Sequence, residues 1–84
     1  MSYRAALTKS FLRELKKLPE EVRNRVLRAV DEILANPFSG LRLRGELEGC
    51  WRWRVGKYRI IYRVEQTSQT VILLDVGLRK AIYE

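Results

Sequence analysis

The chain has 84 residues, which predicts a single domain spanning residues 1–84. Hydrophobic residues make up 46% of the chain and charged residues 32%, a balance that is typical of a folded soluble protein and excludes a disordered one. No apolar run approaches the roughly 18 residues that a membrane span needs, so we expect no membrane association. The net charge of +7 favours a polyanionic partner such as nucleic acid or the ribosome.

Histidine and cysteine usage limit the chemistry further. The chain contains no histidine, which removes the usual acid–base residue and most routes to a transition-metal site, so we expect neither a metal nor another cofactor. The single cysteine, Cys50, cannot form an internal disulfide, and the N-terminal residues lack the apolar segment of a signal peptide. We therefore expect a cytoplasmic protein.

The N-terminal half predicts a strand followed by two helices. Tyr3 to Leu7 is short and leans apolar, as a strand would. Thr8 or Ser10 can cap a first helix, whose apolar residues recur at helical spacing. Pro19 interrupts this pattern and is expected to open a second helix, which ends at Asn36-Pro37. So short a connection between two helices predicts an antiparallel helical hairpin.

The C-terminal half predicts strands. Leu41 to Arg44 alternates apolar and basic residues and is a candidate short strand, and three longer strands are expected at 51–55, 58–65 and 70–78. The element order is then β-α-α-β-β-β-β. We predict an α+β fold in which an antiparallel sheet packs on the N-terminal two-helix hairpin.

A basic β-hairpin is the most informative part of the sequence. Five basic residues and no acidic one lie between Gly49 and Val64, and Gly56-Lys57 is typical of a two-residue turn. Folding the flanks about this turn pairs Val55 with Tyr58, Arg54 with Arg59, Trp53 with Ile60, Arg52 with Ile61 and Trp51 with Tyr62. Alternation then places three arginines on one face and the tryptophans on the other. Because like charges directly opposite destabilise a ladder, we expect an anion such as a phosphate near Arg54 and Arg59.

The same reasoning predicts the register of the last strand. A symmetric fold-back pairs Glu65 with Thr70, Ile61 with Leu74, and Arg59 with Val76, and it places Asp75 opposite Ile60, away from the arginines. Ile61, Ile72 and Leu74 would then share the basic face and leave apolar area open there. This mixture of apolar and basic side chains predicts a protein partner that covers the basic face with acidic and apolar groups.

The motifs resemble those of the RelE/ParE toxin superfamily, and most of all its RelE-type mRNA interferases from type II toxin–antitoxin systems. The resemblance covers the whole chain. It includes the two N-terminal helices and three motifs: L-x-G at 47–49, R-x-R-x-G-x-Y-R-x-x-Y at 52–62, and V-G-x-R-x-x-x-Y at 76–83.

The resemblance implies a metal-free endoribonuclease that cuts mRNA in the ribosomal A site, where a ribose 2′-hydroxyl attacks the adjacent phosphate. It also implies a cognate antitoxin as partner, alongside mRNA and ribosomal RNA. Carried over by position, the catalytic residues would be Arg52, Arg54, Arg59, Arg79 and Tyr83. The remaining basic residues of this region, Lys57, Arg63 and Arg44, are expected to bind RNA. The chain departs from many relatives in having Leu78 where they have histidine, so the resemblance does not identify the groups that act as general base and general acid.

Two alternatives remain at this point. One is a ParE-like inhibitor of DNA gyrase with the same fold, which loss of the clustered basic side chains would favour. The other is a non-catalytic nucleic-acid-binding module, since binding alone also requires phosphate contacts.

Overall fold

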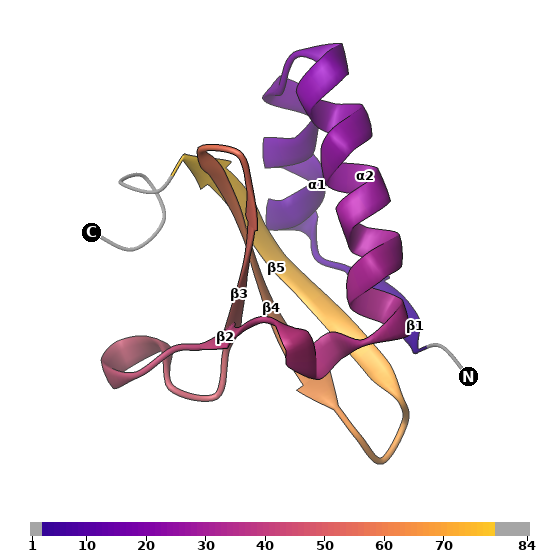
Figure 1. The fold of residues 1–84 in the computed structure, drawn as a ribbon, viewed down its shortest axis with the longest axis vertical. Helices are drawn as coiled ribbons and strands as arrows, with labels where there is room; N and C mark the ends of the chain where they lie inside the picture. The colour runs from indigo at the N-terminus through magenta and orange to yellow at the C-terminus, as the bar shows by residue number, and fades with distance from the viewer. Residues whose placement is uncertain (1–2, 79–84) are drawn as a thin grey trace.

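A computed structural model describes residues 3–78 of the chain. Two helices and five strands follow the predicted order, with two short 3₁₀ turns, η1 and η2, on either side of the second strand. The elements are β1 (Arg4–Leu7), α1 (Lys9–Lys17), α2 (Glu20–Ala35), η1 (Pro37–Ser39), β2 (Leu41–Arg42), η2 (Gly45–Leu47), β3 (Trp51–Val55), β4 (Tyr58–Glu65) and β5 (Thr70–Leu78). Both helices lie on the same side of the twisted sheet, which gives an α+β fold with two layers (Figure 1).

The sheet has the strand order β1-β5-β4-β3-β2. Strands β2 to β5 are antiparallel neighbours, as predicted, whereas β1 pairs with β5 in parallel and makes the sheet mixed. The helices carry the chain from β1 at one edge to β2 at the other, so β1 takes the outer side of β5. The predicted antiparallel sheet is therefore corrected at β1, because the apolar pattern of a short strand does not encode its direction relative to a partner.

Thr8 joins the first helix to the sheet. Its side-chain oxygen accepts a hydrogen bond from the Phe11 N–H at 3.1 Å and so caps α1, while its hydroxyl donates to the Leu73 carbonyl of β5 at 2.8 Å. Thr8, rather than Ser10, is therefore the cap. Pro19 precedes α2 as its N-cap residue, one position earlier than expected, and α2 ends where Asn36 and Pro37 were expected to stop it.

The core lies between the helices and one face of the sheet. Its buried members are Phe11, Leu15, Val26, Ala29, Val30, Ile33, Val55, Ile60, Tyr62, Val71, Leu73 and Val76. Trp51 and Trp53 are partly buried against this cluster, which confirms that they point away from the arginines. Over residues 3–78, no helix is long and apolar enough to cross a membrane.

A β-bulge corrects the predicted pairing of the last two strands. Glu65 pairs with Thr70 and Tyr62 with Leu73, but the register then shifts, so that Ile61 pairs with Asp75 and Arg59 with Gly77. The predicted pairs of Ile61 with Leu74 and of Arg59 with Val76 are therefore wrong, as is the placement of Asp75 opposite Ile60. Leu74 is the extra residue that a bulge inserts.

Candidate functional site

The β3–β4 hairpin has the predicted register at every pair, with Arg54 directly opposite Arg59 and Arg52 opposite Ile61. Gly56 has a φ of +61°, a conformation that glycine adopts readily, whereas the φ of Lys57 is not positive. This combination is that of a type II′ hairpin turn. Since directly opposite residues share a face, Arg52, Arg54 and Arg59 lie together on the face away from the core. We call these three residues the arginine face.

Arg59 occupies the centre of the arginine face and is only 4% exposed, whereas Arg54 beside it is exposed and Arg52 is half-buried. On its other side Arg59 faces Gly77, which has no side chain to crowd it. Arginine keeps its charge in proteins, so a positive charge is fixed here with limited access to water. Such a charge acts more strongly on an anion than a fully solvated one does.

A cavity of about 260 Å³ lies at the rim of the arginine face. Ser39, Gly40, Leu41, Arg52, Trp53 and Arg54 line it. The segment before β2 comes very close to β3 here, because a Cβ placed on Gly40 would lie 2.7 Å from the Arg52 carbonyl oxygen and 2.3 Å from the Tyr62 hydroxyl. Glycine at position 40 is thus required for the approach that shapes the cavity. Gly40 was not among the residues predicted from the sequence, where its only signal was a glycine just before a short strand.

Tyr62 supports this approach from the core side of the sheet. Its hydroxyl donates to the Pro37 carbonyl at 2.7 Å, and burial raises the pKa of Tyr62 to about 12, although a backbone hydrogen bond at Gly40 lowers it. The phenol therefore stays protonated at neutral pH and acts as a fixed hydrogen-bond donor.

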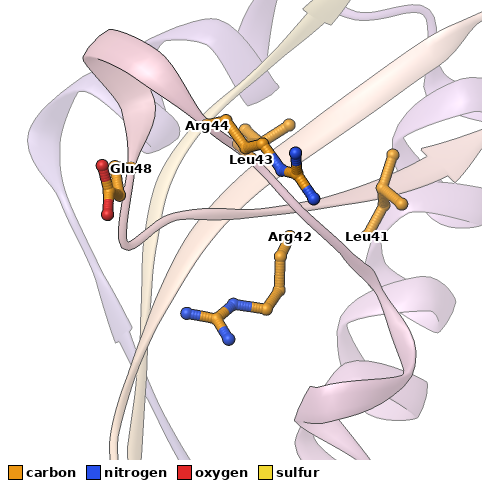
Figure 2. Close-up of a pocket in the computed structure, with 5 residues that line it drawn as sticks. All are labelled: Leu41, Arg42, Leu43, Arg44 and Glu48. Atoms are coloured by element: carbon orange, nitrogen blue, oxygen red, sulfur yellow. The ribbon is translucent and has the colours of Figure 1, made fainter.

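The other basic residues of the region lie around the arginine face. Arg44 lines a second cavity of about 420 Å³ together with Leu41, Arg42, Leu43 and Glu48. Figure 2 shows that the side chains of Arg42 and Arg44 extend in different directions there. Arg63 is exposed on β4 and reaches towards the loop at Gly49, and Lys57 is exposed at the hairpin turn. The two proposed catalytic residues of the C-terminal segment, Arg79 and Tyr83, lie outside the described residues.

The open apolar area predicted on this face is smaller than expected. Ile61 is only 3% exposed, so that part of the expectation is wrong, whereas Ile72 pairs with Arg63 and is half-buried, as is Leu74.

The bulge also changes the surroundings of Asp75. The carboxylate accepts a hydrogen bond from the Val76 N–H at 2.9 Å. Burial raises the pKa of Asp75 above its ordinary value, with Glu14 of α1 acting in the same direction, while the Val76 hydrogen bond and Arg13 lower it. The register puts Asp75 level with Ile61, between the rows of Arg59 and Arg63.

The arrangement is chemically suited to holding a phosphate. Arginine presents a planar fork of donors that matches phosphate oxygens in bidentate contacts. Among residues 3–78, no group of three or more histidine, cysteine or acidic side chains could hold a metal ion. The groups that the structure brings together can bind an anion and stabilise charge that develops on it.

The fold and this basic hairpin define a toxin of the RelE/ParE class. The family model described as the ParE toxin of type II toxin–antitoxin systems matches residues 5–83. The chain therefore belongs to this toxin family.

Relatives on the RelE side are similar over nearly the whole chain. Toxin RelG of Mycobacterium tuberculosis is 37% identical, with 99% of this chain and 98% of the relative covered. The structure of the RelBE2 toxin–antitoxin complex from the same organism matches with a TM-score of 0.88 and 33% identity, covering 94% of this chain and 93% of that one. A mutant of the Escherichia coli toxin RelE in its free state matches with a TM-score of 0.83 and 27% identity, covering 98% of this chain and 88% of that chain. The chain is thus a RelE-family toxin.

Proposed function

We propose that this toxin is a ribosome-dependent endoribonuclease that cleaves mRNA in the ribosomal A site. The observation that carries the proposal is the arginine face: Arg54 and Arg59 stand directly opposite each other, with Arg52 two residues before Arg54 on β3, on the sheet face away from the helices. An RNA phosphate placed between Arg54 and Arg59 would relieve their repulsion and accept hydrogen bonds from both.

The reaction would be an in-line transfer within the RNA. The 2′-hydroxyl gives up its proton and bonds to the adjacent phosphorus, and the bond to the 5′-oxygen breaks. A cyclic phosphate and a 5′-hydroxyl result, once the leaving oxygen takes up a proton. Arg59 and Arg54 would neutralise charge on the crowded phosphorane, and Arg52 would orient the strand. By resemblance, Arg79 and Tyr83 would complete the site.

The composition of the site supports a role for the ribosome. The arginines are poor proton acceptors, and Tyr62, with its raised pKa, lies on the core side of the sheet. Most of the rate would then come from holding the 2′-oxygen in line with the phosphate. Ribosome-bound mRNA presents a fixed geometry of this kind, so naked RNA should be cleaved much more slowly.

A cognate antitoxin would neutralise the toxin. The RelBE2 relative was solved as a toxin–antitoxin complex, which supports a partner of the same kind here. The partly exposed Ile72 and Leu74 beside the basic residues favour a partner segment with acidic and apolar side chains.

Gyrase inhibition is the second candidate, and the match to the ParE family model favours it. The two candidate functions require different chemistry of the arginine face, because an endoribonuclease must stabilise a phosphorane and a gyrase inhibitor has none to stabilise. Primer extension on programmed ribosomes and a supercoiling assay with purified gyrase separate them directly.

The sharpest test compares Arg59→Gln with Arg63→Gln. Both residues lie on β4 and on the same face, but only Arg59 is central and buried. In single-turnover cleavage at saturating toxin, Arg59→Gln should lose roughly 10²–10³-fold in rate, while Arg63→Gln should mainly weaken binding. Arg54→Gln, an exposed position where a folding defect is not expected, should also lower the saturated rate. Equal and small losses in all three variants would refute the catalytic assignment.

A further inference from the structure

A second group of arginines lies where α2 passes the β3–β4 turn. Arg25 and Arg28 are three residues apart on α2, so they share one face of the helix, and both are exposed. The chain needs neither for its core, because the buried positions of this turn of the helix are Val26, Ala29 and Val30. Two cations that do not support the core are therefore directed to the surface beside the hairpin.

The Arg25 guanidinium lies close to the turn itself. A Cβ placed on Gly56 would lie 3.0 Å from one of its terminal nitrogens and 3.7 Å from the guanidinium carbon. Glycine at position 56 thus serves two purposes, since it allows the positive φ of the turn and leaves room for Arg25. This contact brings the charge of α2 to the end of the same hairpin that carries the arginine face.

The three arginines share a cavity of about 300 Å³. Arg25, Arg28, Ala29, Glu32, Trp53, Arg54, Val55 and Gly56 line it. Within the part of the chain that the structure describes, the ion pairs are those of Glu14 with Arg13 and Lys17, so neither Glu32 nor another acid pairs with Arg25, Arg28 or Arg54. Three positive groups face one negative group here, and an added anion would lower their mutual repulsion.

Arg54 connects this cavity to the arginine face. It lines both the 260 Å³ cavity with Arg52 and the 300 Å³ cavity with Arg25 and Arg28. Between them runs an edge of β3 that is open to an extended ligand, because β2 pairs with β3 only at Trp51 and Arg52. The positive surface therefore continues from the arginine face, around the edge of β3, and onto α2.

We propose that Arg25 and Arg28, together with Arg54, bind a second backbone phosphate of the RNA and so extend the binding track beyond the site of cleavage. The occupant is a phosphate rather than a base, because three arginines line the cavity and its one aromatic residue, Trp53, is partly buried against the core. The contact would position the strand without reading sequence. The inference rests on the proposed function in taking RNA as the ligand.

The test measures binding without cleavage. The full-length double variant Arg25→Gln/Arg28→Gln is titrated with a short single-stranded RNA whose ribose 2′-oxygens are methylated, so that no nucleophile is present. Its control is Arg4→Gln/Lys9→Gln, which removes the same charge from exposed residues around β1, at the opposite edge of the sheet. Thermal unfolding of both variants establishes that they are folded.

We expect the dissociation constant of the α2 variant to rise on the order of tenfold at low salt, with little change in the control. The slope of log affinity against log salt should fall by about 0.7 for each phosphate that the variant no longer neutralises. An affinity and a salt slope equal to those of the control would overturn the proposal. A weaker affinity with an unchanged slope would also overturn it, because the arginines would then act through packing.

The binding result separates this inference from the proposed function. Loss of RNA binding in the α2 variant would support the second phosphate site even if the wild-type toxin proved not to cleave ribosome-bound mRNA. Cleavage by the wild type, with RNA binding of the α2 variant equal to that of the control, would uphold the proposed function and refute the second site.

Discussion

Gly40→Ala offers the most direct test of how the cavity beside the arginine face is built. The backbone at Gly40 has φ −74° and ψ −174°, which alanine adopts without strain, so any effect must come from contacts of the added methyl group. That group would lie 2.3 Å from the Tyr62 hydroxyl and 2.7 Å from the Arg52 carbonyl oxygen. Both distances are far below van der Waals contact, and the second involves backbone, which cannot rotate away.

The expected loss of stability combines two terms. Forcing a methyl group into a filled space typically costs about 1–3 kcal/mol. Displacing the Tyr62 hydroxyl from the Pro37 carbonyl, now 2.7 Å away, would add about 0.5–1.5 kcal/mol. We therefore expect Gly40→Ala to lower the free energy of unfolding by about 2–4 kcal/mol, measured by urea denaturation. Cleavage should also fall, because β3 must shift at Arg52 to relieve the second contact.

Two further variants make this result decisive. At Gly45 a Cβ would meet no atom within 4 Å, but φ is +72°, so Gly45→Ala should cost only the roughly 1–2 kcal/mol of a left-handed alanine and leave cleavage intact. Combining Gly40→Ala with Tyr62→Phe removes the closest contact, so the double variant should be more stable than the sum of the single losses predicts. Strict additivity, or a Gly40→Ala protein as stable as the wild type, would show that the approach of this segment to β3 is not as tight as described.

Three other substitutions test the charges of the sheet. Arg54→Gln should raise stability at low salt by about 0.2–1 kcal/mol by removing the repulsion from Arg59, a gain that added salt abolishes; an unchanged denaturation midpoint would argue against that repulsion. Burial raises the pKa of Tyr62 from 10.0 to about 12, so the protonated phenol stabilises the fold fully below pH 10 and this stabilisation is lost as the pH rises to 12. Over this range the free energy of unfolding of the wild type should fall by roughly 2–3 kcal/mol more than that of Tyr62→Phe, measured in parallel denaturation curves. The pKa of Asp75 is likewise raised, so its carboxyl group favours folding below its ordinary pKa of 3.8 and less so as the pH rises; Asp75→Asn, which keeps an oxygen for the Val76 N–H, should be more stable than wild type at pH 7 and not at low pH.

The hairpin could be predicted in full because local rules determine it. Gly56-Lys57 specifies a two-residue turn, and once the turn is fixed the register of β3 and β4 follows residue by residue. The alternation of arginine with tryptophan then assigns the faces. The two helices could also be predicted from local signals, since Thr8, Pro19 and Asn36-Pro37 mark their boundaries and apolar residues recur at helical spacing.

The features that the sequence did not predict depend on contacts between distant segments. The parallel pairing of β1 with β5 brings Arg4 opposite Thr70, and the strand composition does not specify that direction. The cavity at Arg25 depends on how α2 lies beside the hairpin turn, and the closeness of Gly40 to Arg52 depends on the path of the chain into β2. Each requires knowledge of tertiary packing that periodicity alone does not contain.

The bulge in β5 shows how one such feature serves both the core and the site. In the symmetric register the Val76 side chain would stand beside the Arg59 guanidinium on the arginine face. The extra residue shifts the strand by one position, so Val76 pairs instead with Ile60 and is buried in the core at 1% exposure, while Gly77 comes opposite Arg59. A single inserted residue thus adds an apolar side chain to a small core and at the same time removes one from beside the central arginine. The apolar run from Val71 to Leu74 conceals this shift, because its residues suit either face of the sheet.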